Sequence, residues 1–182
     1  MGACIANSPH NSESYGAAIK NENENVNAPA VRVLCLGNEL LADDCLGYVV
    51  ADWLRPFASL QAEIVSTSES GFHLLDYLLG VRRLIVVDTI QTGAATPGTI
   101  YQFSENDLQS VPGGSPHYIG LFETLALARH LGLPVAEEIS ILAVETADCL
   151  TVGGELHPEV RAAIPILTAM VRDLIHATTC AS

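Results

Sequence analysis

Two adjacent aspartates, Asp43 and Asp44, occur in the stretch GNELLADDCLG, which runs from Gly37 to Gly47. The stretch begins where one apolar run ends and finishes where the next apolar segment begins. A turn from a strand into a helix needs one capping residue, so two carboxylates require a further explanation. The pair can cap the helix, bind a metal ion or take part in acid–base chemistry.

Asp88 and His117 are two further residues that can do chemistry. Asp88 follows the apolar run LIVV at residues 84–87, and His117 follows Ser115 and Pro116. Two carboxylates and an imidazole suit a divalent transition metal with open positions for a substrate, and they do not rank nickel, zinc, copper or iron. Each residue also has a structural interpretation, because an aspartate can cap a helix or orient a loop and a histidine can lie near a helix start.

The elements that must position these residues alternate along the chain. Continuous apolar runs predict strands at residues 31–36, 62–66, 84–87 and 138–144, and residues 92–103 predict a turn that leads into an edge or antiparallel strand. Apolar residues at helical spacing predict helices at residues 44–57, 72–79, 117–131 and 158–177. This alternation predicts a three-layer α/β/α sandwich with a mostly parallel, twisted sheet and one antiparallel edge strand within residues 92–103.

The predicted sheet gives the candidate residues a common location. Ligands in such folds bind beyond the carboxyl ends of the strands. The loops after residues 31–36 and 84–87 should meet there with the start of the helix at residue 117. We therefore expect Asp44, Asp88 and His117 to converge at this edge.

Length and composition indicate one domain. The chain has 182 residues, of which 49% are hydrophobic, and this is enough for one sizeable core but too short for two comfortable domains. Residues 1–30 are rich in Asn, Ser, Glu and Ala and poor in large apolar residues, so we expect a mobile N-terminal tail. Residues 31–182 should form a single α/β domain.

Charge and cysteine usage restrict the partners and the compartment. The formal net charge of −13 argues against nucleic acid and against an anionic membrane surface as partners. No apolar run approaches the roughly 20 residues of a membrane span, and the N-terminus lacks the pattern of a secretory signal. Five scattered cysteines without a CxxC motif favour a reducing compartment, so we expect a cytoplasmic protein.

Other well-known catalytic motifs are missing from the sequence. It contains no HExxH, GxSxG, GxGxxG or GxxxxGK[ST], so the usual zinc protease, serine hydrolase, dinucleotide and P-loop interpretations lose their main signal. Cys149 follows Asp148 in a predicted loop, and a cysteine nucleophile with His117 as its base remains an alternative.

Four motifs in order carry a resemblance to a known family. GNELLADDCLG is similar to the pattern GN-x-L-x-x-D-[DE]-x-x-G, and IVVDTI, TPGTIYQF and SPHYIGL follow at residues 85–90, 96–103 and 115–121. Over residues 31–175 the chain thereby resembles the hydrogenase maturation proteases. The resemblance implies an endopeptidase domain that removes the C-terminal extension of a nickel–iron hydrogenase large-subunit precursor after nickel insertion.

The resemblance also implies roles for individual residues. It places the metal-contacting and catalytic positions of the family on Asp44, Asp88 and His117. Asp43 matches the preceding acidic position and should support the turn and the helix start, in a motif framed by Gly37 and Gly47. The nickel would be contributed by the bound precursor and not held permanently.

The sequence departs from the family in the loop after the second strand. Many members have a D-G-G-T-type stretch there, whereas this chain has STSE at residues 66–69, followed by Ser70 and Gly71. The family uses this loop in choosing the hydrogenase, so the particular hydrogenase stays open. A resident-metal α/β hydrolase and a non-catalytic chaperone that checks the metal of the precursor also remain alternatives.

Overall fold

The computed structural model describes residues 29–59, 62–104 and 116–177, without the side chains of residues 116–119. The tail predicted for residues 1–30 falls almost entirely outside the described residues, and the predicted extent of the domain stays a prediction. The strands are β1 Val31–Leu36, β2 Ala62–Thr67, β3 Arg83–Ile90, β4 Ile100–Ser104 and β5 Glu138–Glu145. The α-helices are α1 Leu46–Leu54, α2 Leu75–Leu78, α3 Pro116–His130 and α4 Pro158–Ala177.

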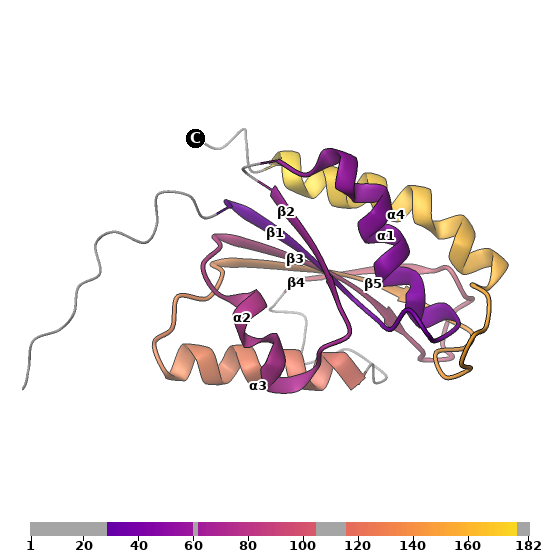
Figure 1. Ribbon diagram of the computed structural model, residues 1–182, viewed down its shortest axis with the longest axis horizontal. Coiled ribbons are helices and arrows are strands. Elements are labelled where there is room, and N and C mark those ends of the chain that lie inside the picture. Colours follow the sequence, from indigo (N-terminus) through magenta and orange to yellow (C-terminus); the bar gives the residue numbers. More distant parts are fainter. Residues whose placement is uncertain (1–28, 60–61, 105–115, 178–182) are drawn as a thin grey trace, which may run out of the picture.

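The described strands form one sheet in the order β2-β1-β3-β5-β4 (Figure 1). β1, β2, β3 and β5 are parallel, and β4 pairs antiparallel with β5 at the sheet edge. Because these four strands run in the same direction, their carboxyl ends all lie at one edge of the sheet. The predicted mostly parallel sheet with one antiparallel edge strand is confirmed.

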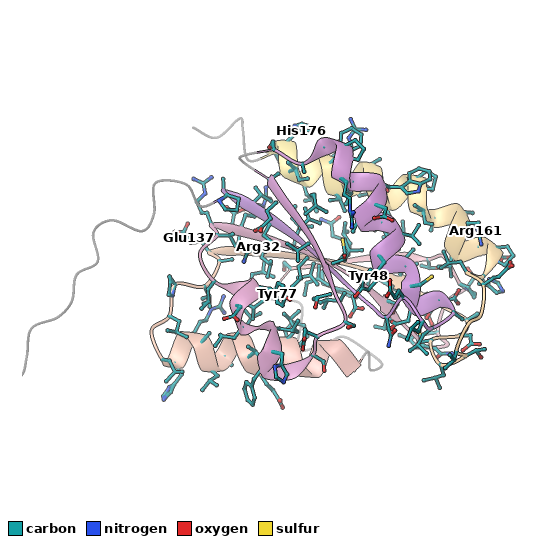
Figure 2. All side chains as sticks on the ribbon, viewed as in Figure 1. Arg32, Tyr48, Tyr77, Glu137, Arg161 and His176 are labelled. Carbon is teal, nitrogen blue, oxygen red and sulfur yellow. The ribbon has the colours of Figure 1, made fainter. Side chains whose placement is uncertain are left out.

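Helices cover both faces of the sheet, with α1 and α4 on one face and α2 and α3 on the other (Figure 1). Apolar side chains fill the space between the sheet and each helix layer (Figure 2). Successive residues of a strand point to opposite faces. In β3, Ile85 and Val87 therefore pack on the α1 and α4 side, whereas Leu84 and Val86 pack on the α2 and α3 side.

Two of the predicted helices are interrupted by 3₁₀ turns in the structure. The helix predicted at residues 44–57 is a 3₁₀ helix at Asp43–Cys45, then α1, then a second 3₁₀ helix at Arg55–Phe57. Pro56 has no backbone N–H, which explains why the α-helical hydrogen bonding does not continue past Leu54. The helix predicted at residues 72–79 is a 3₁₀ helix at Gly71–Leu74 followed by the single turn of α2.

The strand predicted at residues 84–87 is longer than expected, and this affects the candidate site. Pairing with β5 continues past Asp88 until Ile90 lies opposite Glu145. Asp88 therefore lies inside β3 and not at its end.

Among the described residues, no helix is long and apolar enough to span a membrane.

Candidate active site

Asp44 and Asp88 are brought together by Thr89 at the carboxyl edge of the sheet. The Thr89 hydroxyl donates a hydrogen bond to Asp44 Oδ1 over 2.7 Å, and the Thr89 backbone N–H donates one to Asp88 Oδ1, also over 2.7 Å. The exposed fraction is 6% for Asp44, 0% for Asp88 and 2% for Thr89. Two buried carboxylates thus share one hydrogen-bonding residue. The sequence predicted that the carboxylates would lie at this edge, but it did not predict the role of Thr89.

The two carboxylates approach this edge from opposite faces of the sheet. Asp88 alternates with Val87 along β3 and so belongs to the α2 and α3 side. Thr89 belongs to the α1 and α4 side, where Asp44 lies in the 3₁₀ helix that leads into α1. A ligand in contact with both carboxylates would therefore lie beyond the strand ends, where the two faces meet.

A close approach of two backbones fixes the helix that carries Asp44. A Cβ atom on Gly47 would collide with the carbonyl oxygen of Leu36, so only glycine allows α1 to begin against the end of β1. The Asn38 side chain accepts a hydrogen bond from Leu40 N over 3.0 Å, which orders the loop after β1.

Asp43 does not support the helix start in the way the sequence suggested. No helix N–H donates to its side chain, which is 1% exposed. Its Oδ2 accepts hydrogen bonds from Ala147 N and Asp148 N, over 2.9 and 3.0 Å, and its Oδ1 accepts one from His157 N over 2.6 Å. Through these hydrogen bonds, Asp43 holds the loop between β5 and α4 against the candidate site. Capping was the wrong interpretation because these partners are remote in sequence.

The first turn of α3 carries His117, whose side chain lies outside the described part of the structure. The placement of the helix itself is fixed by a contact with the segment after β2. The Thr124 hydroxyl donates a hydrogen bond to the Gly71 carbonyl over 3.0 Å, and a Cβ atom on Gly120 would come within 2.6 Å of the Gly71 Cα. α3 lies on the same side of the sheet as Asp88.

Among the side chains that the structure describes, no group of three or more His, Cys, Asp or Glu residues has the arrangement of a metal site. This observation does not include the imidazole of His117. The described carboxylates supply at most the oxygen ligands, and the nitrogen ligand stays a prediction.

Cys149 lies beside the candidate site, but its thiol is poorly suited to be a nucleophile. Its Sγ lies 2.9 Å from the Thr146 hydroxyl oxygen and 3.8 Å from that of Thr89. Burial raises the pKa of the Cys149 thiol and the carboxylates of Asp44 and Asp43 raise it further, against a lowering by the two hydroxyls. The thiolate is the nucleophilic form, so this environment disfavours the cysteine–histidine alternative.

Glu145, which the sequence did not single out, organises the loop after β3. Its carboxylate accepts hydrogen bonds from Thr92 N and Gly93 N over 2.8 Å, from the Thr92 hydroxyl over 2.7 Å and from the Tyr101 hydroxyl over 3.2 Å. Burial raises the pKa of Glu145, but these hydrogen bonds outweigh the burial and lower it overall. The side chain is thus an ionised anchor for the loop at residues 91–99.

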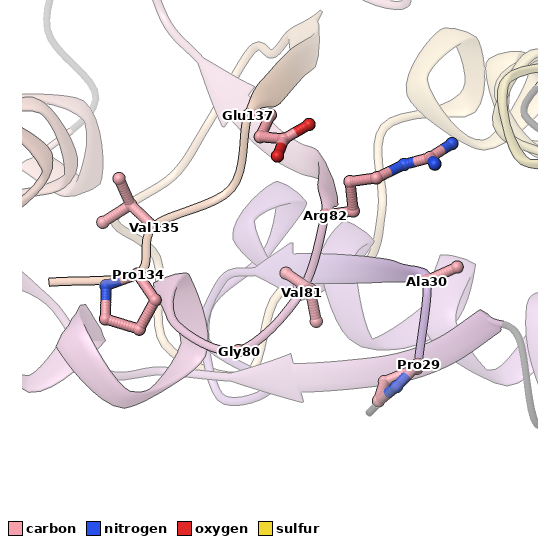
Figure 3. A pocket seen from close by; sticks show the side chains of 8 residues that line it. All are labelled: Pro29, Ala30, Gly80, Val81, Arg82, Pro134, Val135 and Glu137. Atoms are coloured by element: carbon pink, nitrogen blue, oxygen red, sulfur yellow. The ribbon is translucent and has the colours of Figure 1, made fainter. Parts of the chain in front are cut away.

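A pocket of about 360 Å³ lies at the opposite end of the molecule from this site. Figure 3 shows that Pro29, Ala30, Gly80 and Pro134 contribute to its wall, and these residues lie at or before the amino ends of strands. Substrates of α/β proteins bind at the carboxyl ends, so this pocket does not compete with the candidate site.

The model of the hydrogenase maturation protease family, HycI, matches residues 55–174, which is more than half of the chain. The chain therefore belongs to the hydrogenase maturation protease family. The matched range includes Asp88 and His117, whereas Asp44 lies before it. No curated protein matches the chain.

Solved structures of maturation proteases have the same fold. The hydrogenase maturating endopeptidase HybD from E. coli is 24% identical with a TM-score of 0.72, and the match covers 81% of this chain and 93% of that one. The [NiFe] hydrogenase maturation protease HybD from Thermococcus kodakarensis is 25% identical with a TM-score of 0.64, and the match covers 80% and 98%. An endopeptidase from Escherichia coli is 26% identical with a TM-score of 0.65, covering 77% and 89%.

Proposed function

We propose that this protein removes the C-terminal extension of a nickel–iron hydrogenase large-subunit precursor after nickel has been inserted. Membership of the maturation protease family supports the reaction type. The observation that carries the assignment of the site is the link of Asp44 and Asp88 through Thr89 at the carboxyl edge. With His117 at the start of α3, these carboxylates would contact the nickel that the precursor brings.

The proposed chemistry is hydrolysis of one peptide bond. The nickel is part of the substrate, and a metal ion close to the scissile bond polarises a carbonyl and lowers the pKa of a bound water. A carboxylate at the site can take the proton from the attacking water. Asp44 and Asp88 are the candidates for this role, with His117 as the third contact.

We also propose that residues 31–182 form the single peptidase domain and that the protein acts in the cytoplasm. The described strands and helices belong to one sheet and its two helix layers, which supports the first proposal. Scattered cysteines support the second: Cys35, Cys45 and Cys149 are all free thiols in the described residues.

The proposal is tested by mixing the purified protein with precursor that contains nickel and with precursor that lacks it. We expect the extension to be released from the nickel-loaded precursor alone, which intact-mass spectrometry detects. Formation of a stable complex without release of a peptide would instead identify a metal-checking chaperone. Equal cleavage of both precursors would show that inserted nickel is not required.

A further inference from the structure

Among the described strands, β2 lies at an edge of the sheet near the candidate site. Among the described strands it pairs only with β1. The Thr67 carbonyl accepts a hydrogen bond from Gly37 N on the β1 side, and alternation along the strand directs the backbone groups of Ile64 and Ser66 away from β1. In Figure 1 this edge faces the viewer, between α1 above and α2 below. Such an edge is a template for pairing with another extended segment.

A groove of about 450 Å³ runs beside this edge. Glu63 and Val65 of β2 form one wall, and Asp76 and Tyr77 of α2 form another. Figure 2 shows Arg32 and Tyr77 on this side of the sheet, next to α2. Beside the edge that β2 presents among the described strands, the groove therefore offers a row of side chains that can distinguish between occupants.

The charge of the groove favours a basic occupant. The positive charge of Arg32 is already paired within the protein. Its Nε donates a hydrogen bond to Glu63 Oε2 over 2.7 Å, and its Nη1 donates one to the Tyr77 carbonyl over 2.8 Å. Glu69 is 4.0 Å from an exposed His73, and the exposed Asp76 makes no ion pair with any described residue. The carboxylate of Asp76, and that of Glu69 when His73 is neutral, can thus attract a cation.

The carboxyl end of β2 lies beside the loop that leads to the candidate active site. Leu36 lies opposite Thr67 where β1 and β2 end, and the next residue, Gly37, begins the loop that carries Asp44. A strand advances by about 3.3 Å per residue, so a segment of five or six residues leaving the site would span the length of β2. A substrate whose scissile bond lies at the site could therefore continue along this edge.

We propose that the groove binds the C-terminal extension of the precursor as a strand added to β2, with a Lys or Arg side chain between Glu69 and Asp76. The proposal rests on the proposed function, because that function supplies the extension. It extends the function by assigning the specificity for the released segment to the β2 edge and to two carboxylates.

The test uses a synthetic peptide with the sequence of the released extension and the full-length protein. Hydrogen exchange should show protection of the Ile64 and Ser66 amides when the peptide binds. The E69Q/D76N variant should weaken binding about fivefold at low salt, as expected for two exposed ion pairs. Replacing the basic residue of the peptide by Gln should cause a similar loss that does not add to that of the variant. The D52N variant is the matched control, since Asp52 is an exposed acid on α1.

Three results would overturn the proposal. They are unprotected Ile64 and Ser66 amides, unchanged binding by E69Q/D76N, and an extension without Lys or Arg. Protection of the same amides on raising the protein concentration without peptide would assign the edge to a second copy of this chain. Failure of the function is distinguishable, because a peptide that binds the groove while the nickel-loaded precursor stays uncut contradicts only the proposed function.

Discussion

Asp44 and Asp88 owe their arrangement to Thr89, whose hydroxyl and backbone N–H each bind one of the two carboxylates. Because consecutive residues of β3 point to opposite faces, one dipeptide serves both sides of the sheet. A threonine in a strand is ordinarily a β-former with no further role. Its position after Asp88, in the otherwise apolar run IVVDTI, is the one sign in the sequence that it does more.

The first prediction concerns the proposed catalytic residues. D44N and H117A should each lower processing of a nickel-loaded precursor by about 10²–10⁴-fold, the usual contribution of a positioned acid–base group. Both variants should keep the far-UV circular dichroism and melting temperature of the native protein, because Asn can still accept from Thr89 and His117 is near a helix end. D52N is the control. Processing at the normal rate by either variant would show that the site is assigned wrongly.

Asp43 gives a second prediction, on stability. D43N places an amide N–H₂ where a carboxylate oxygen now accepts from backbone N–H groups, so donors would face donors. Hydrogen bonds to a charged group contribute about 1.5–3 kcal/mol, and we expect a loss of about 2–3 kcal/mol in urea unfolding. Hydrogen exchange at Ala147, Asp148 and His157 should speed up more than exchange in the sheet. Unchanged exchange at these amides would contradict the role given to Asp43.

At the scale of elements, the site depends on three segments that follow strands. The loop after β1 carries Asp44, the loop after β3 is held by Glu145, and the loop after β5 is held by Asp43. Each anchor is a buried carboxylate that accepts backbone N–H bonds. Charge-assisted hydrogen bonds to Glu145 and Asp43 therefore help to fix the loops after β3 and β5.

Glu145 leads to a third prediction, on the pH dependence of stability. Its pKa is lowered in the folded protein, so the folded state binds fewer protons than the unfolded state. This stabilisation is fully present above the unfolded pKa of about 4.3 and is lost as the pH falls through the lowered folded pKa. The difference in unfolding free energy between the native protein and E145Q should therefore shrink as the pH drops below about 4.3. E155Q, at an exposed carboxylate, is the control, and a pH-independent difference for E145Q would refute the prediction.

The sequence was sufficient to predict the order of the elements and the convergence of Asp44 and Asp88. Buried parallel strands have continuous apolar runs, which identify them in the sequence. Ligands bind beyond the carboxyl ends of such strands, so residues that follow the strands are expected to lie together. The function of Asp43 could not be predicted, because its partners lie 104 to 114 residues further along the chain. Helix capping considers only residues that are close in sequence, so it predicted the wrong hydrogen-bond partners for Asp43. The end of β3 was missed because its last residues are held by pairing with β5 and not by an apolar pattern.

At the scale of the whole molecule, the protein combines an acidic surface with a site at one end of the sheet. The net charge of −13 and the acidic groove beside β2 both favour a basic segment in the substrate. The family model matches residues 55–174, and the solved structure of HybD from E. coli has the same fold.

A fourth prediction separates a metal brought by the substrate from a resident one. The purified protein, treated with a chelator and then desalted, should contain less than one metal ion per chain by elemental analysis. It should still process a nickel-loaded precursor at its original rate, because the metal belongs to the precursor. Stoichiometric metal that survives chelation, or activity that returns only when metal is added to the protein, would favour a resident-metal hydrolase.

The most direct test of the central claim is intact-mass analysis of the hydrogenase large subunits in cells that lack this gene, compared with normal cells. We predict that one large subunit keeps its C-terminal extension in the deleted strain and loses it when the gene is restored. The same measurement identifies the substrate. If every large subunit is mature in the deleted strain, and no second protease of this family is present, the proposed function is contradicted.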